Sequence, residues 1–225
     1  MAALRALSLL ETRIVGVLVE KQHTVSDSYP LSLNTLVLGC NQKTAREPVM
    51  NVSEADVLAA IDDLKGLSLV IEVSGSRVSR YEHNLQRVLM VPSQSVAILT
   101  LLMLRGPQTS AELRATTERL HRFADISSVE AFLEELAERS AEKGGPLVIK
   151  LPRAAGAREP RWAHLLSGPV DVSALAAASN AIPEDLVSAG EIAALKANQM
   201  RLHAEVAMLR AQLHRLAAEL GVDLG

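Results

Sequence analysis

The side chains best suited to chemistry or binding gather in one stretch of this sequence, CNQKTAREPVM, which runs from Cys40 to Met50. The stretch brings a thiol, two amides, two cations and a carboxylate into eight consecutive positions, after an apolar segment and before a proline. Asn41 or Gln42 can satisfy carbonyls at the end of a helix, and Pro48 disfavours helical backbone at the residue before it. The whole set also fits a polar surface that recognises a protein partner or a nucleic acid. We favour capping and keep recognition as the alternative.

The recognition hypothesis extends to the preceding segment SDSYPLSLNT, which adds a carboxylate, a phenol and an amide. Together these polar groups define a candidate recognition surface, which consists of Asp27, Tyr29, Asn34, Gln42, Lys43, Arg46 and Glu47.

Motifs that carry catalysis or hold metals are missing from the sequence. Cys40 is the single cysteine, and there is no HExxH pair, P-loop, GxGxxG or GxSxG. A lone cysteine after an apolar helix is typical of a small buried hydrophobic residue. His83 and His164 each follow an aromatic residue by two positions, which we interpret as duplicated packing. We therefore expect no catalytic residue, no metal, no cofactor and no enzymatic activity.

Composition and charge narrow the class of protein further. The 225 residues are 48% hydrophobic but only 2% aromatic, so the core must be aliphatic. The net charge of −3 gives no general attraction to nucleic acid or to an anionic membrane. The apolar runs are too short to span a membrane, and a single cysteine fits a reducing compartment. We expect a soluble cytoplasmic protein without membrane contact.

An internal repeat of roughly 80 residues organises the elements that position these side chains. VSEADVLAAIDDL, LVIEV and SRYEHNL recur as ISSVEAFLEEL, LVIKL and PRWAHLL. Helical spacing, β-branched runs and N-cap candidates (Ser53, and Ser127 or Ser128) predict three helices and two strands in each copy. The expected fold is mainly α with small β wings (α+β), as two tandem winged-helix domains over residues 1–89 and 90–168.

Several long segments resemble the signature segments of the YceH family of bacterial proteins, which have two winged-helix domains. They are EKQHTVSDSYPLSLNTLVLGCNQKTAREPVM, RYEH, LMLRGPQT and LPRAAGAREPRWAHL. The resemblance spans residues 8–166. It implies the tandem winged-helix fold, and it implies no particular activity.

The charges on the expected third helices argue against insertion into a DNA groove. Phosphate contact needs cations, whereas these helices are mostly acidic. Their acids are Glu54, Asp56, Asp62 and Asp63 in the first copy, and Glu130, Glu134, Glu135 and Glu138 in the second. Cations lie instead in and near the expected wings, where we name as candidate nucleic-acid contacts Arg77, Arg80, Arg153, Arg158 and Arg161. We favour the reading that these are ordinary exposed charges, with phosphate contact as the alternative.

A heptad pattern follows a linker over residues 169–190 and predicts a coiled-coil dimerisation helix over residues 191–221. Its seam alternates steps of three and four through Ile192, Leu195, Gln199, Leu202, Val206, Leu209, Leu213, Leu216 and Leu220. The pattern favours a parallel two-stranded homodimer.

The sequence therefore favours a non-enzymatic binding or scaffold module with an unknown protein partner. The alternative is a DNA-binding transcriptional regulator that contacts DNA through its wings and the turn from Lys43 to Arg46.

Overall fold

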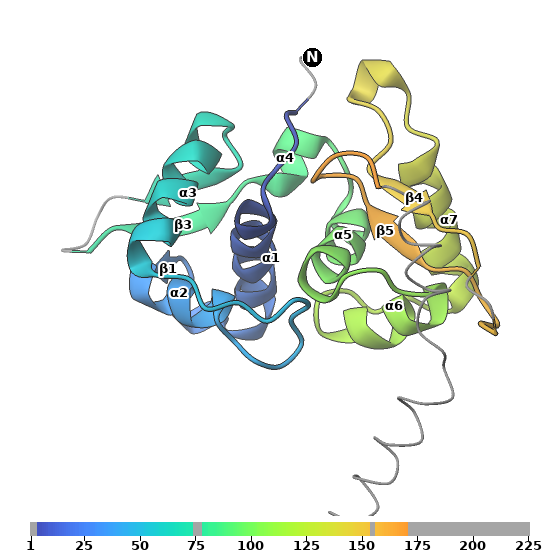
Figure 1. Ribbon diagram of the computed structural model, residues 1–225, viewed down its shortest axis with the longest axis horizontal. Helices are drawn as coiled ribbons and strands as arrows, with labels where there is room; N and C mark the ends of the chain where they lie inside the picture. Colours follow the sequence, from blue (N-terminus) through green and yellow to red (C-terminus); the bar gives the residue numbers. More distant parts are fainter. Residues whose placement is uncertain (1–3, 74–77, 154–155, 171–225) are drawn as a thin grey trace, which may run out of the picture. The chain divides into compact units, whose positions relative to one another are not determined.

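The computed structural model describes residues 4–73, 78–153 and 156–170 (Figure 1). Over these residues the fold is mixed, with helices and two small antiparallel sheets, which agrees with the expected α+β class. The predicted coiled-coil helix and most of the predicted linker lie outside the described residues.

The two sequence copies have the same order of main elements. The first contains α1 (Leu9–Thr24), η1 (Ser26–Ser28), β1 (Leu31–Ser32), α2 (Leu33–Cys40), α3 (Glu54–Gly66), β2 (Val70–Val73) and β3 (Arg80–His83), and α4 (Leu85–Leu89) follows. The second contains α5 (Ser93–Arg105), α6 (Ser110–Thr116), η2 (Thr117–Arg119), α7 (Ile126–Ala137), η3 (Ala141–Lys143), β4 (Val148–Lys150) and β5 (Trp162–His164).

The first sheet has one strand more than the sequence predicted. Its order is β1-β3-β2, and β1 pairs with β3 through Leu31 opposite Tyr81. A two-residue strand is too short to give the alternating pattern by which strands are found in sequence. In the second copy, the described residues have only an isolated bridge between Gln108 and Trp162 at this place, beside the β4-β5 pair.

Helix starts follow the local chemistry of the chain. Ser53 caps α3 as predicted, and Asp56 completes a capping box with it. For α7 the prediction of Ser127 or Ser128 as the cap is wrong, because Asp125 caps the helix and accepts a hydrogen bond from the Ser128 N–H at 2.7 Å. Aspartate is as good an N-cap as serine, and the helix begins earlier than its apolar pattern suggests.

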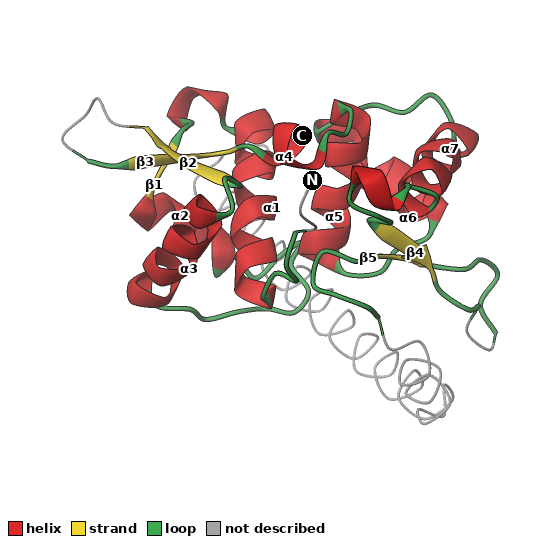
Figure 2. Cartoon of the chain, turned by 90° about the horizontal axis from the view of Figure 1, so that it is seen from above, coloured by secondary structure: helices red, strands yellow, loops and turns green. Residues whose placement is uncertain are grey.

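The core is centred on α1 and α5, the first helices of the two copies, which pack against each other (Figures 1 and 2). Residues 11–19 of α1 are all buried, because α1 also packs on α2 and α3 of its own copy. Gly16 allows the close approach, since a Cβ there would lie 2.8 Å from Leu104 Cδ2. The two copies therefore share one aliphatic core.

Candidate functional site

The stretch from Cys40 to Met50 forms the connection between α2 and α3, and two arginines hold it in place. Arg13, on α1, is fully buried and donates to the Cys40 carbonyl at 3.1 Å and to the Pro48 carbonyl at 2.6 Å. Its guanidinium therefore joins the end of α2 to the far end of the connection. A cation near the last carbonyls of a helix is also favoured by the helix dipole.

Arg46 is the second arginine, and its side chain has no exposed surface. It donates to both carboxylate oxygens of Glu20 on α1, at 3.1 and 2.6 Å, and to the Gly39 carbonyl at 3.2 Å. Burial raises the pKa of Glu20, but the hydrogen bonds and charge of Arg46, together with those of Lys21, more than offset this and hold that pKa below its usual value. The placement corrects the expectation that Arg46 belongs to an exposed recognition surface.

Asn41 and Glu47 give the connection two further attachments. The Asn41 side chain donates to the Val52 carbonyl at 2.9 Å and accepts from the Val52 N–H at 2.8 Å. The Glu47 N–H donates to the Leu104 carbonyl at 2.8 Å, near the end of α5. The stretch thus bonds to α1, to α2 and to the second copy, which goes beyond the helix capping that we favoured.

Cys40 is buried, as the sequence predicted. Burial raises the pKa of its thiol to about 12. Because the thiolate is the nucleophilic form, this cysteine is unreactive at neutral pH.

The remaining candidate recognition residues fall into two groups. Asp27 and Tyr29 lie before β1, where the Tyr29 hydroxyl accepts a hydrogen bond from the backbone N–H of His83 at 2.9 Å. Lys43 and Glu47 have exposed side chains in the connection, while Gln42 is half-buried and contacts Thr44 and Lys21. Asn34 is exposed on α2. Within the described part of the chain, no hydrogen bond or ion pair joins the two groups.

The third helices expose their acids at matching positions. Asp62 and Asp63 of α3 occupy the same places after the N-cap as Glu134 and Glu135 of α7, and all four are exposed. In each helix the apolar residues on either side of this acidic pair are buried, such as Ile61 and Leu64 in α3. Both helices therefore present a carboxylate-rich outer face.

The wing arginines differ in what they contact. Arg80 donates to the carbonyls of Ser28 and Pro30, and Arg161 pairs with Glu112 at 3.4 Å and donates to a carbonyl. Arg153 and Arg158 are exposed, and within the described residues neither takes part in an ion pair. Arg77 lies outside the described residues.

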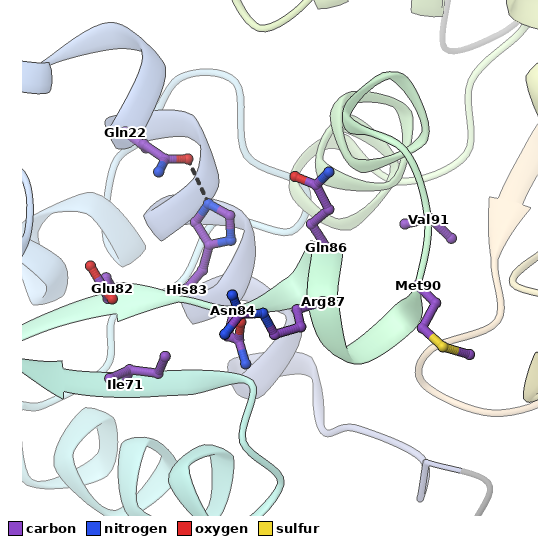
Figure 3. Close-up of a pocket in the computed structure, with 9 residues that line it drawn as sticks. All are labelled: Gln22, Ile71, Glu82, His83, Asn84, Gln86, Arg87, Met90 and Val91. Carbon is purple, nitrogen blue, oxygen red and sulfur yellow. Dashed lines mark hydrogen bonds between the residues drawn. The ribbon is translucent and has the colours of Figure 1, made fainter. Parts of the chain in front are cut away.

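A hollow that the sequence did not predict lies where β3 meets α4 (Figure 3). It has a volume of about 690 Å³, and its wall includes Glu82 and His83 of β3, Gln22 of α1 and Arg87 of α4. His83 Nε2 lies 2.7 Å from Gln22 Oε1, so the neutral imidazole donates there. No local pattern marks this hollow, because its residues come from separate elements.

Burial keeps the side chains of both strand histidines, His83 and His164, uncharged. Burial lowers the pKa of His83 to about 4, with a smaller effect from the charge of His23. Burial alone lowers the pKa of His164 to about 4. Both imidazoles are therefore neutral at pH 7.

The described residues lack two kinds of feature. No group of three or more His, Cys, Asp or Glu side chains there is placed to hold a metal ion. No helix there is long and apolar enough to cross a membrane.

Comparison with known proteins places the chain among bacterial relatives. A family described as "Protein of unknown function, DUF480" matches residues 7–157. A UPF0502 protein of Methylibium petroleiphilum is 78% identical over 223 residues, which cover 99% of this chain and 94% of that protein. UPF0502 proteins of Burkholderia ambifaria and Burkholderia orbicola are 63% and 62% identical over 222 residues, which cover 99% of this chain and 92% of each relative. The chain therefore belongs to the DUF480 family, whose relatives in these bacteria are UPF0502 proteins.

Proposed function

We propose that this protein is a non-enzymatic binding module, built from two tandem winged helices, that engages a protein partner. The repeated order of three helices followed by two paired strands supports the winged-helix assignment. Fold alone does not decide between a nucleic acid and a protein as partner, so the charge of the exposed faces must do so.

The acidic outer faces of α3 and α7 carry the proposal. In a DNA-binding winged helix the third helix enters the major groove, where phosphates surround it. Asp62 and Asp63, and equally Glu134 and Glu135, would meet those phosphates with like charge. The same faces are complementary to a partner that presents lysine and arginine side chains, and such complementarity favours rapid and selective association.

Charge reversal on both helices tests this proposal. The quadruple variant with lysine at Asp62, Asp63, Glu134 and Glu135 should lose the partner that the wild-type chain retains from a lysate of its host. These side chains are exposed, so thermal unfolding should show a folded variant. The matched control reverses Glu118, an exposed acid on η2, and should retain the partner. Retention of the same partner by the quadruple variant would contradict the proposal.

DNA contact through the second wing is the alternative. Arg153 and Arg158 favour it, because both are exposed and neither forms an ion pair with the described part of the chain. If these residues bind phosphates, affinity for a random duplex should fall steeply with salt. Changing both to glutamate should then reduce that salt dependence, whereas changing Lys43 to glutamate tests the turn. Duplex binding without salt dependence, or binding unaffected by these changes, excludes the alternative.

Dimerisation through residues 191–221 is a further part of the proposal and rests on the sequence pattern alone. The expected parallel pair would present two copies of each acidic face to one partner, which raises avidity. Leu202→Asp combined with Leu209→Asp should give a monomer by light scattering. A wild-type chain that stays monomeric at high micromolar concentration would exclude the dimer.

A further inference from the structure

A second cavity lies at the boundary between the two sequence copies. It has a volume of about 520 Å³ and is enclosed by the segment before α1, by α4, by the turn before β4 and by the residues after β5. Its wall is largely apolar and includes Leu4, Val88, Leu147 and Leu166. Concave, mostly apolar cavities of this size are typical of small-molecule sites.

The charged residues that line this cavity are all cations, namely Arg5, Arg139 and Lys143. Arg5 already has a counter-ion, because it forms two hydrogen bonds with the Glu11 carboxylate at 2.9 and 2.5 Å. Arg139 and Lys143 differ, since among the described residues neither takes part in an ion pair. The cavity therefore combines a largely apolar wall with two cations that form no ion pair within the described residues.

Arg139 is held so that its charge is only partly compensated. Its guanidinium donates to the Leu89 carbonyl at 2.8 Å and to the Lys143 carbonyl, while its buried Nε–H has no acceptor among the described residues. Burial lowers the pKa of Arg139, and the charge of Glu135 opposes this. Arg139 and Lys143 also line a neighbouring cavity, whose wall includes Glu135 and Glu138. A guanidinium binds carboxylates strongly, and here the protein supplies carbonyl oxygens in their place.

We propose that this cavity binds a small amphiphilic anion, an aliphatic carboxylate. Its head group would contact Arg139 and Lys143, and its tail would lie against the leucine and valine side chains. The ligand would contact both sequence copies and so stabilise their packing. This inference is independent of the protein partner proposed above, because neither cation lies on the acidic faces of α3 and α7.

Calorimetric titration of the full chain with decanoate, below its micellar concentration, tests the proposal. Decanoate should bind and raise the melting temperature. Decanol, which keeps the tail without the charge, should bind at least tenfold more weakly, and acetate, which keeps the head group alone, should not bind measurably. Equal affinity for decanoate and decanol, or no binding of decanoate, would overturn the proposal.

Two variants assign the binding to this cavity. Lys143→Glu should weaken decanoate binding at least tenfold, whereas Arg119→Glu, the same charge change at an exposed residue outside the cavity, should alter it less than twofold. Val88→Phe should fill the space and abolish binding, and circular dichroism checks that it remains folded. If Val88→Phe does not fold, Lys143→Glu decides alone. Equal effects of Lys143→Glu and Arg119→Glu would overturn the site.

Discussion

Replacing Arg46 with alanine should destabilise the protein strongly, because the side chain of Arg46 is buried and fully engaged in hydrogen bonds, although its polar neighbours in the sequence suggest a binding motif. Its guanidinium makes five hydrogen bonds, two of them to Glu20 and one to the Gly39 carbonyl. Removing one partner of a buried ion pair destabilises by about 3–5 kcal/mol, because the other charge is left without compensation. Glu20 keeps 16% exposure and a contact with Lys21 at 3.4 Å, so we expect the lower end of that range.

Urea unfolding followed by circular dichroism measures this loss. A change of about 3 kcal/mol corresponds to a fall in melting temperature of about 6–12 °C for a protein of this size. Lys43→Ala is the matched control in the same stretch, and because Lys43 is exposed it should change stability by less than about 0.5 kcal/mol. Combining Arg46→Ala with Glu20→Gln should cost less than the two single changes added together, since the residues are coupled. A loss below about 1 kcal/mol for Arg46→Ala would refute the structural role and return this residue to the recognition hypothesis.

Two other properties follow from the packing of the core. Gly16→Val should destabilise by about 1–3 kcal/mol, because its side chain would meet Leu104; Gly66→Val, where a Cβ meets nothing within 4 Å, should be close to neutral in the same unfolding assay. The pKa values of His83 and His164 are about 4 in the folded chain, against an ordinary 6.5 when unfolded. Between pH 4 and pH 6.5 the unfolded chain binds more protons at these histidines than the folded chain does. The stability that the two neutral histidines contribute is therefore present above pH 6.5 and is lost as pH falls toward 4, by up to about 3 kcal/mol for each histidine. Stability measured from pH 7 to pH 4 should therefore fall less steeply in a variant with glutamine at both positions, and identical slopes for the two proteins would contradict the reasoning.

Local features of the sequence determined the helices and their outer faces. The order of three helices and two main strands was predictable in both sequence copies. The signals are helical spacing, β-branched runs and the N-cap Ser53, all of which depend only on residues close together in the chain. The acids of α3 and α7 were predictable on the outside for the same reason, since an apolar stripe facing inward leaves them facing solvent. Burial of Cys40 also followed from its place at the end of an apolar segment.

Only the tertiary structure decided what the polar residues of the central stretch contact. Arg46 pairs with Glu20, which lies 26 residues earlier on α1, and the backbone N–H of Glu47 donates to the Leu104 carbonyl near the end of α5. No local pattern identifies either partner. The short strand β1 and the cavity lined by Arg139 likewise form only when separate elements meet. Local propensity acts over one or two turns of chain, so helices and their exposed faces can be predicted from the sequence. Ion pairs and cavities depend on residues that folding brings together from distant positions, so only the tertiary structure reveals them.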